Sequence, residues 1–203
     1  LVKFLAGLNP VRYFQGAVEP MMVAFTSTSS SGTLPVTMMS CERNLGVSRS
    51  VSSFVLPLGA TINMDGTALY QGVCAVFIAQ AYGLDLNSSQ YLTIILTATL
   101  ASIGTAGVPG AGLIMLSLVL TSVGLPLEGV AIIAGIDRIL DMARTALNVT
   151  GDCAVACVVA RSEGQLDETV FNRAHVLRAD ADVVGAPEAG REAVAAPSSQ
   201  STN

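Results

Sequence analysis

The sequence has few charged residues. Asp, Glu, Lys and Arg make up 12% of its 203 residues, whereas an ordinary soluble domain has roughly 25%. Residues 50–136 contain only three charges, on Asp65, Asp85 and Glu128, while residues 161–203 hold seven acidic residues and four arginines. This scarcity excludes a typical water-soluble chain. It predicts that the larger part of the protein lies in a membrane and that its C-terminal segment lies in water.

Basic side chains are scarce as well. Ten Lys and Arg stand against 15 Asp and Glu, so the formal net charge is −5. Nucleic-acid binding needs a basic face for the phosphates, and the composition therefore disfavours it. No collagen repeat, coiled-coil pattern or disulfide framework fits the sequence either.

The four cysteines lie in apolar surroundings, which predicts buried free thiols rather than disulfides. Cys153 and Cys157 are one helical turn apart, but no histidine is near them in the sequence, so we assign no metal to this pair. The chain begins at Leu1, and its first residues do not have the pattern of a signal segment. We therefore expect a piece of a longer protein.

The apolar runs of the sequence are short. A helix needs about 20 apolar residues to span a bilayer, because each residue adds about 1.5 Å. Here, segments of small or polar residues interrupt the apolar runs at 29–35, 61–67 and 102–110. Backbone that leaves a helix at membrane depth must be buried in protein or line a wet cavity. The interruptions are therefore expected to mark a site.

We predict an all-α membrane protein with two re-entrant helical hairpins, a broken transmembrane helix and a polar transmembrane helix. Both hairpin tips are small, polar and closed by a proline, which is typical of an inverted repeat with a binding site between its halves. Residues 1–16 would end a preceding segment and form a cytoplasmic connection. Residues 161–203 would form a disordered cytoplasmic tail that contains the solvated His175. The core, 17–160, would consist of hairpin 1 (about 17–44), the broken helix (about 47–82), hairpin 2 (about 90–123) and the polar helix (about 128–160).

The basic residues of the loops indicate sidedness. If each hairpin enters and leaves on one side, the loops 83–90 and 124–129 share one face, and they contain no Lys or Arg. Cytoplasmic loops are enriched in Lys and Arg, so the opposite face and the C-terminus should be cytoplasmic. That face would carry Lys3, Arg12, Arg43, Arg49 and Arg161.

A polar stripe runs along the last predicted helix. At about 100° per residue, its five members fall within an arc of roughly 80°. Each ionised residue at the centre of a bilayer costs on the order of 3 kcal/mol, so the stripe must face protein, water or ligand. A self-satisfied pair of Asp141 and Arg144 is one interpretation. A buried ion pair is often no more stable than an apolar pair, however, and we favour a functional site. The stripe consists of Asp137, Asp141, Arg144, Asn148 and Asp152.

The stripe has the chemistry of a pocket for a small acidic amino acid. The Arg144 guanidinium suits a carboxylate, and Asp141 could accept an ammonium group. Asn148 and serine hydroxyls could hold a second carboxylate. Asp65 and Asp152, beside carbonyls released at the helix breaks, offer the oxygen ligands that a hard cation prefers.

Four segments resemble the signature elements of the glutamate transporter family, the dicarboxylate/amino acid:cation symporters. The match covers about residues 9–160 in order and spacing. It implies that residues 17–160 form a carboxyl-terminal transport core and that six preceding helices, including a trimerisation scaffold, are absent. We therefore expect a multi-pass membrane protein that lies in the lipid bilayer of a bacterial inner membrane. The full-length protein would be a homotrimer. The four segments are residues 29–35, 63–67, 102–110 and 137–152.

The resemblance also implies the site residues. It implies a transporter rather than an enzyme, with no catalytic residue, and sodium as coupling ion without an organic cofactor. The substrate-binding residues would be Thr28, Ser30, Thr67, Val108, Asp141, Arg144, Thr145 and Asn148. The sodium ligands, through side chains or backbone carbonyls, would be Gly59, Thr61, Asn63, Asp65, Ser102, Ile103, Thr105, Asn148 and Asp152.

The sequence departs from the family pattern at one point. Members usually carry a second arginine near the substrate, at the position of Thr28 or of Met142, and here both residues are uncharged. Arg138 stands one turn before Met142, and we expect it to substitute and to pair with Asp141 when the site is empty. By the same resemblance, Asp141 favours an amino acid over a C4-dicarboxylate, and Arg144 favours an acidic one.

The leading hypothesis is secondary active symport of glutamate or aspartate, coupled to sodium by alternating access, with the second hairpin closing over the ligand. The sequence leaves open proton coupling, a C4-dicarboxylate substrate and a passive channel. An alternative from another class is an intramembrane aspartyl protease, in which Asp65 and Asp137 would share a proton.

Overall fold

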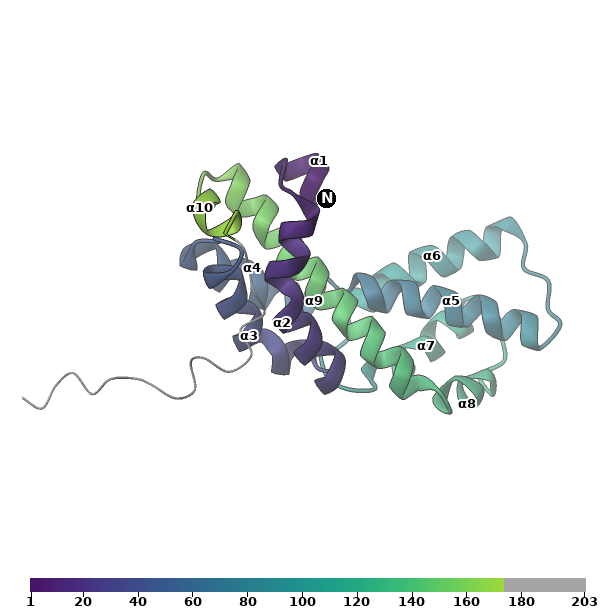
Figure 1. Cartoon of the computed structure of the whole chain (residues 1–203). Helices are drawn as coiled ribbons and strands as arrows, with labels where there is room; N and C mark the ends of the chain where they lie inside the picture. Colours follow the sequence, from purple (N-terminus) through teal and green to yellow (C-terminus); the bar gives the residue numbers. More distant parts are fainter. Residues whose placement is uncertain (174–203) are drawn as a thin grey trace, which may run out of the picture.

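The computed structural model describes residues 1–173, which are helical nearly throughout (Figure 1). The prediction of an all-α protein is confirmed for this part of the chain. Re-entrance of the hairpins and the inverted repeat stay predictions. The helices are α1 (Val2–Ala6), α2 (Pro10–Ser27), α3 (Ser30–Arg43), α4 (Arg49–Ile62), α5 (Asp65–Ala81), α6 (Ser88–Ile103), α7 (Ala111–Ser122), α8 (Gly129–Ala134), α9 (Asp137–Ser162) and α10 (Glu168–Phe171).

The first helix pair, α2 and α3, turns within two residues. Thr28 adopts a left-handed conformation (φ 55°) that ends α2, and the Ser29 hydroxyl accepts a hydrogen bond from the Gly32 N–H (3.0 Å) and so begins α3. The pair starts earlier than the predicted residue 17. Pro10 occupies the first turn of α2 and the Asn9 side chain caps it, which favours a helix start at this point.

The second pair, α6 and α7, has a wider tip. α6 ends at Ile103 and α7 begins after Gly110, which has a φ of 76° that glycine tolerates without strain. Between the two pairs, α4 and α5 are separated only by Asn63 and Met64. This is the break that the sequence predicted for the long apolar run.

Helix α9 is the axis of the molecule. Its 26 residues span about 39 Å, and it packs against α1, α2, α3, α4, α5 and α8. A short interruption at Gly135 and Ile136 separates α9 from α8. In Figure 1, α9 runs from the end that carries α1 and α10 to the end where α8 lies.

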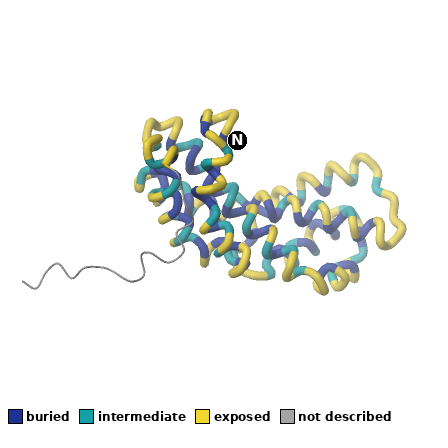
Figure 2. The backbone as a smooth tube through the Cα atoms, in the orientation of Figure 1, coloured by how far each residue is buried: buried dark blue, intermediate teal, exposed yellow. Residues whose placement is uncertain are grey.

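Two hydrophobic clusters stabilise the fold, and Figure 2 shows the buried backbone running through both. One joins α1–α4, α10 and the C-terminal half of α9, with Tyr13 and Leu56 among its buried residues. The other joins α5–α8, with Ile78 and Leu116 among its members. Between them lies the middle of α9, where polar residues replace apolar ones. All four cysteines are free and buried, as predicted.

The segment after α9 is packed, not a loose tail, up to residue 173. Leu166 pairs with Val47 in an isolated antiparallel bridge, and the Asp167 N–H donates to the Gly46 carbonyl (2.7 Å). Phe171 is 1% exposed and belongs to the first hydrophobic cluster. Residues 161–173 thus pack against the rest of the fold, and a disordered tail over 161–203 stays a prediction. Residues 174–203, including His175, lie outside the described residues.

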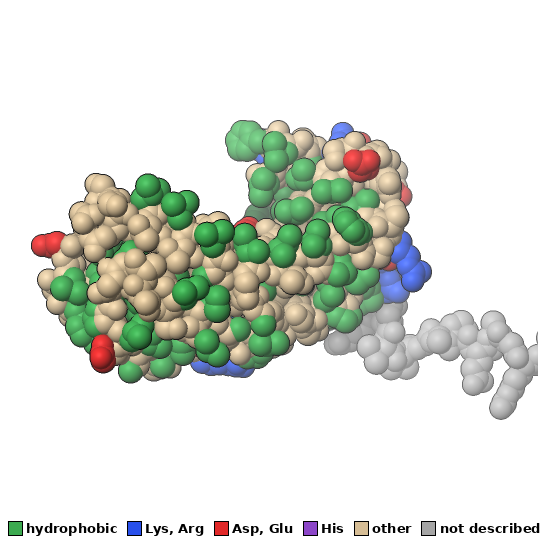
Figure 3. All heavy atoms as spheres, turned by 180° about the vertical axis from the view of Figure 1, so that it is seen from behind, with side chains coloured by type: hydrophobic (Ala, Val, Ile, Leu, Met, Phe, Trp, Pro, Cys, Tyr) green, Lys and Arg blue, Asp and Glu red, His purple; other side chains and the backbone are tan. Residues whose placement is uncertain are grey.

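Many large hydrophobic side chains are exposed on the surface of the described residues. Figure 3 shows hydrophobic side chains over most of the length of one face, and Phe54, Leu100 and Ile114 are each at least 70% exposed. Within residues 1–173, none of the helices has both the length and the apolar sequence needed to cross a bilayer.

Candidate functional site

The polar stripe of α9 is buried in its central part. Asp141, Arg144, Asn148 and Asp152 are between 2% and 7% exposed, whereas Asp137, at the first position of α9, is only partly buried. The side chains point into the space where the two helix pairs and the break between α4 and α5 converge. The stripe is therefore buried against protein along four of its five members.

Asp141 and Arg144 form a buried ion pair that leaves one donor free within the described residues. Arg144 donates to Asp141 Oδ1 through Nε (3.1 Å) and Nη2. The Thr145 hydroxyl donates to the same oxygen (3.2 Å), and the Gly110 N–H at the second tip donates to Asp141 Oδ2 (2.9 Å). Arg144 Nη1 is buried and has no hydrogen-bond partner in this part of the chain. Because buried polar groups are normally satisfied, this nitrogen is a candidate donor to a bound anion.

The surroundings of Arg144 come from α5 and α7. Its Cζ lies 5.5 Å from the centre of the Tyr70 ring, a cation–π contact, and the Tyr70 hydroxyl donates to Asp137 Oδ1 (2.7 Å). On the other side, α7 approaches so closely that a Cβ on Gly112 would lie 1.7 Å from Arg144 Nη1. Sequence reasoning missed Tyr70 and Gly112. The position of Tyr70 one turn after Thr67, on the same face of a helix, was the available signal.

Asn148 joins the stripe to the start of α5. Met64, which precedes α5, provides no side-chain cap, and the first N–H groups of a helix need acceptors from elsewhere. Asn148 Oδ1 accepts from the N–H groups of Gly66 (2.8 Å) and Thr67 (3.3 Å), while its Nδ2 donates to the Thr67 hydroxyl (3.1 Å). One side chain of α9 thus caps another helix at the break.

The two tips contact each other. The Gly107 carbonyl accepts from the Ser29 hydroxyl (2.9 Å) and from the Ser31 N–H (3.2 Å). A Cβ on Gly107 would lie 2.6 Å from Ser31 Oγ, so glycine is what allows this approach. Residues about 78 positions apart in the chain therefore meet at one point.

A small pocket lies between the tips, α5 and α9, with about 170 Å³ of atom-free space. Seven of the eight residues predicted to bind substrate line it, and the eighth, Asp141, is bound to Arg144 directly behind it. Sequence reasoning missed Met64, Ala106 and Gly107. The pocket is lined by Thr28, Ser30, Met64, Thr67, Ala106, Gly107, Val108, Arg144, Thr145 and Asn148.

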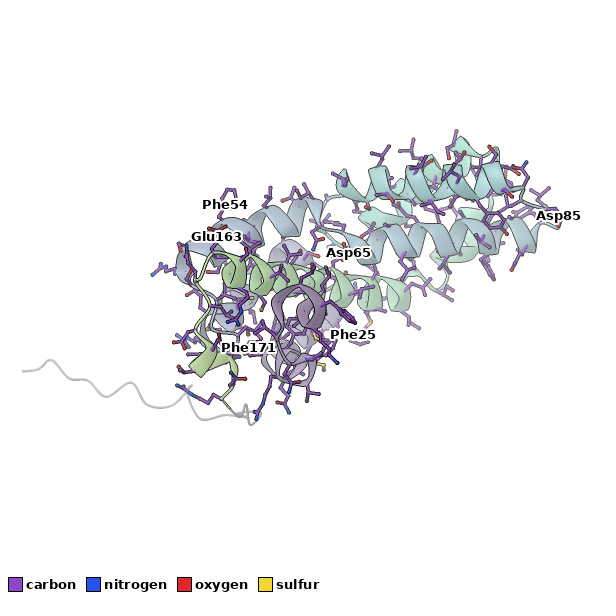
Figure 4. The ribbon with its side chains drawn as sticks, turned by 90° about the horizontal axis from the view of Figure 1, so that it is seen from above. Phe25, Phe54, Asp65, Asp85, Glu163 and Phe171 are labelled. Atoms are coloured by element: carbon purple, nitrogen blue, oxygen red, sulfur yellow. The ribbon has the colours of Figure 1, made fainter. Side chains whose placement is uncertain are left out.

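Several predicted sodium ligands gather where the break between α4 and α5 meets α9. Asn63 Nδ2 donates to Asp152 Oδ1 (2.9 Å), and a Cβ on Gly59 would lie 2.6 Å from the same oxygen. A Cβ on Gly151 would be 2.9 Å from Asp65 Oδ2, so this exposed carboxylate also lies beside α9, as Figure 4 shows.

The predicted ligands in and just after α6 do not offer free side-chain oxygens. The residues Ser102, in α6, and Thr105, just after α6, are buried, and their hydroxyls donate to carbonyls of α6 (2.8 and 2.7 Å). The exposed Thr61 hydroxyl does the same on α4 (3.0 Å), and Ile103 has no polar side chain. Any ion bound here would depend on their backbone carbonyls. The described residues contain no cluster of three or more His, Cys, Asp or Glu side chains suited to a metal.

Comparison with known proteins identifies the family of the chain. A model of the sodium:dicarboxylate symporter family matches residues 1–162. The chain belongs to this family. The resemblance inferred from the four signature segments is thereby confirmed.

Relatives within the symporter family include transporters from animals. Over 160 residues, 78% of this chain, it is 49% identical to excitatory amino acid transporter 2 of Homo sapiens and 52% identical to an excitatory amino acid transporter of Caenorhabditis elegans. It is 46% identical to excitatory amino acid transporter 5 of Homo sapiens over 157 residues, 77% of this chain. The matched region spans 28%, 32% and 28% of these relatives, less than a third of their length.

Membership of a symporter family also decides against the protease alternative, because the family and these relatives are transporters and not enzymes. The geometry agrees. Asp65 lies beside Gly151, fourteen residues along α9 from Asp137, which corresponds to about 21 Å. Two carboxyl groups that share a proton must be in contact, and these are not.

Arg138 does not pair with Asp141, which corrects the sequence-based expectation. Asp141 is engaged by Arg144, and Arg138 Nη1 instead donates to the Thr28 hydroxyl (2.8 Å). The reason is geometric: on a helix, Asp141 lies between the two arginines, but the guanidinium of Arg138 extends toward the first tip.

Proposed function

We propose that this chain forms the substrate-binding part of a membrane symporter that takes up an acidic amino acid, glutamate or aspartate, coupled to sodium by alternating access. The observation that carries the proposal is that Arg144, whose buried Nη1 lacks a partner in the described residues, borders a pocket between two contacting helix tips. A cation with an unused donor in a site closed to water is suited to an anion.

The ion pair between Arg144 and Asp141 prepares the pocket for an amino acid. A bound side-chain carboxylate would accept from Arg144, and Asp141 would then be free to accept from the substrate ammonium group. The amide of Asn148, the hydroxyl of Ser30 and that of Thr145 border the space where the second carboxylate and the ammonium group would lie. Binding would exchange one internal ion pair for two ion pairs with the ligand, so neither charge would be left uncompensated.

The position of Asn148 supports the proposal of sodium coupling. This side chain borders the pocket and also caps α5 at the break where Asn63, Asp65 and Asp152 gather. Carboxylates and released carbonyls form the oxygen-rich ligand set that a hard cation prefers. An ion that orders this break would fix Gly66 and Thr67, and hence Asn148, in the conformation that binds substrate. The two affinities would then be linked, and such linkage is reciprocal.

The remaining architecture belongs to the same proposal. The α2–α3 and α6–α7 pairs would be re-entrant hairpins of an inverted repeat, and movement of the second tip, which holds Asp141 through Gly110, would open the pocket. The protein would lie in a bacterial inner membrane with its C-terminus in the cytoplasm. The full-length protein would be a homotrimer assembled through helices that precede this segment.

The decisive test is uptake by the full-length protein in proteoliposomes with an imposed sodium gradient, compared with an imposed pH gradient. We expect sodium-driven uptake of glutamate or aspartate and little uptake of succinate or alanine. Uptake driven by the pH gradient alone would favour the proton-coupled alternative. Preferred uptake of succinate would favour a C4-dicarboxylate.

Arg144→Met should raise the KM for the acidic amino acid by about 100-fold or more, since truncating one partner of a buried charge pair costs roughly 2–5 kcal/mol. Arg161→Met is the matched control, because Arg161 forms an exposed ion pair with Glu168, and it should leave uptake unchanged. Unaltered glutamate and aspartate uptake by Arg144→Met would remove Arg144 from the pocket and refute the proposal.

A further inference from the structure

The first tip contains an unfavourable backbone conformation. Thr28 is the one non-glycine residue with a positive φ in residues 1–173, at 55°. A β-branched residue is a genuine outlier in this region, and such conformations persist only where surrounding contacts impose them. Thr28 borders the pocket, so whatever holds its backbone also sets the shape of the pocket.

Three hydrogen bonds hold Thr28. Its N–H donates to the Ala24 carbonyl (2.9 Å), which ends α2. Its hydroxyl donates to the Ser27 carbonyl (2.7 Å) and accepts from Arg138 Nη1 (2.8 Å). The side chain is 1% exposed. Arg138 is thus the contact from a distant element that fixes this hydroxyl.

Arg138 lacks the features of an arginine that acts by ion pairing. The ion pairs within residues 1–173 are those of Arg144 with Asp141 and of Arg161 with Glu168. Arg138 also occupies the first turn of α9, where the positive end of the helix dipole disfavours a cation. Its described polar contact is the bond to Thr28, which as a charge-assisted bond is stronger than one between neutral groups.

We infer that Arg138 is a positioning residue of the substrate pocket: through the Thr28 hydroxyl it holds the first tip in the conformation that binds the acidic substrate. The inference rests on the proposed function. Arg138 links the first turn of α9 to the first tip, while Asp141 of the same helix holds the second tip through the Gly110 N–H. One helix therefore fixes both sides of the pocket.

The test uses the full-length protein in proteoliposomes and measures KM and maximal rate separately. Arg138→Met, which keeps the length of the side chain and removes its donors, should raise the KM about tenfold, the effect of losing one charge-assisted bond, and change the maximal rate less than about twofold. Arg138→Lys retains a charged donor and should recover most of the affinity. A merely structural arginine would lower the amount of folded protein without this division between KM and rate.

Combining variants tests whether Arg138 acts through its hydrogen bond to the Thr28 hydroxyl. Thr28→Val should raise the KM as Arg138→Met does, and the double variant should be no worse than either one alone, because both remove the same bond. Thr28→Ser keeps the hydroxyl that accepts from Arg138 and should therefore raise the KM less than Thr28→Val does. Additive effects of the two substitutions, or an unchanged KM in Arg138→Met, would overturn the inference.

A readout independent of transport separates this inference from the proposed function. Hydrogen exchange at the amides of residues 28–31 should be faster in Arg138→Met than in wild type, and equal exchange would overturn the positioning role whatever the substrate is. Absence of acidic amino acid uptake by wild type refutes the proposed function instead. It also overturns the assignment of Arg138 to an acidic substrate.

Discussion

At the scale of single residues, the site depends on glycines, which have no side chain, as much as on its polar side chains. Gly112 allows α7 to contact the Arg144 guanidinium, and Gly66 allows α5 to lie against the Arg144 carbonyl, where a Cβ would come within 2.4 Å. Gly59 makes room for the Asp152 carboxylate. Substituting these glycines therefore changes the geometry of charged groups without changing any charge.

Gly112→Ala should impair substrate binding more than folding. The new Cβ would meet the end of a flexible side chain, so the guanidinium can move aside at small cost. A displacement of about 1 Å can cost on the order of 100-fold in a preorganised site, and we expect the KM for acidic substrate to rise 10- to 100-fold with little change in thermal stability.

Gly72→Ala is the matched control for that substitution, because nothing lies within 4 Å of the new Cβ in the described structure. It should leave both KM and stability close to wild type. An equal rise of KM in both variants would contradict the argument from the contact between Gly112 and Arg144.

The stripe was predictable residue by residue, since the helical period alone places Asp141, Arg144, Asn148 and Asp152 on one face. The contacts that complete the site were not. Whether Gly112 reaches Arg144, or Arg138 reaches Thr28, depends on how separate helices pack, and neither period nor composition encodes that distance. Gln71 illustrates the same limit: it is 0% exposed and has no hydrogen-bond partner in the described residues, although its sequence context resembles an ordinary helix face.

At the scale of helices, breaks are stabilised by groups from other elements. The start of α5 depends on Asn148 of α9, and the Ser31 N–H at the start of α3 donates to the Gly107 carbonyl of the second tip. The sequence predicted an interruption near each of these places, because small and polar residues accumulate there, but it predicted longer ones than the structure has, since residues 30–35 are helical in α3 and residues 65–67 are helical in α5. It could not show which distant residue would satisfy the released backbone groups.

Asn148 is expected to have two separable roles. Asn148→Leu leaves the Gly66 and Thr67 N–H groups without an acceptor, and each unsatisfied buried group costs about 1–3 kcal/mol, so the thermal midpoint should fall. Asn148→Asp keeps the acceptor near a helix N-terminus, where a negative charge is favourable, and should retain more stability. It should nevertheless lose binding of the acidic substrate through repulsion.

The measurements for Asn148 are thermal unfolding of the full-length protein in detergent and uptake in proteoliposomes. We expect a large loss of stability for Asn148→Leu, a smaller loss for Asn148→Asp, and impaired uptake by both variants. If Leu and Asp lower the midpoint equally, the cap on α5 is not what Asn148 contributes.

At the scale of the whole molecule, the segment that follows α9 covers one end of the structure. Figure 4 shows Asp85, in the loop between α5 and α6, and Glu163, just after α9, at opposite ends of an elongated molecule. The end near Glu163 is closed by a clasp, residues 165–171, which lies on the connection between α3 and α4. This clasp could not be predicted, because the polar composition of the C-terminal segment conceals the one apolar ring that anchors it.

The ionisation of Asp167 should determine how the stability of the clasp changes with pH. Its carboxylate accepts from the Thr169 hydroxyl (2.6 Å) and from the N–H groups of Val170 and Thr169 (3.3 and 2.9 Å), and these bonds lower its pKa below the usual value. A lowered pKa in the folded state means that the carboxylate contributes stability above its unfolded pKa, about 3.9, and loses it as the pH falls through the folded pKa. Acidification from pH 7 to pH 5 should therefore leave the clasp intact.

Hydrogen exchange at the amides of residues 169–171 in the full-length protein measures this response. Asp167→Ala should accelerate exchange at pH 7, because α10 loses its cap, whereas Asp167→Asn keeps a side-chain oxygen that can accept the same bonds and should remain protected. Below about pH 4, after correction for intrinsic rates, wild type should approach Asp167→Ala while Asp167→Asn does not change. Protection of the clasp that is equal in all three proteins would show that Phe171 alone holds it and that the cap contributes nothing.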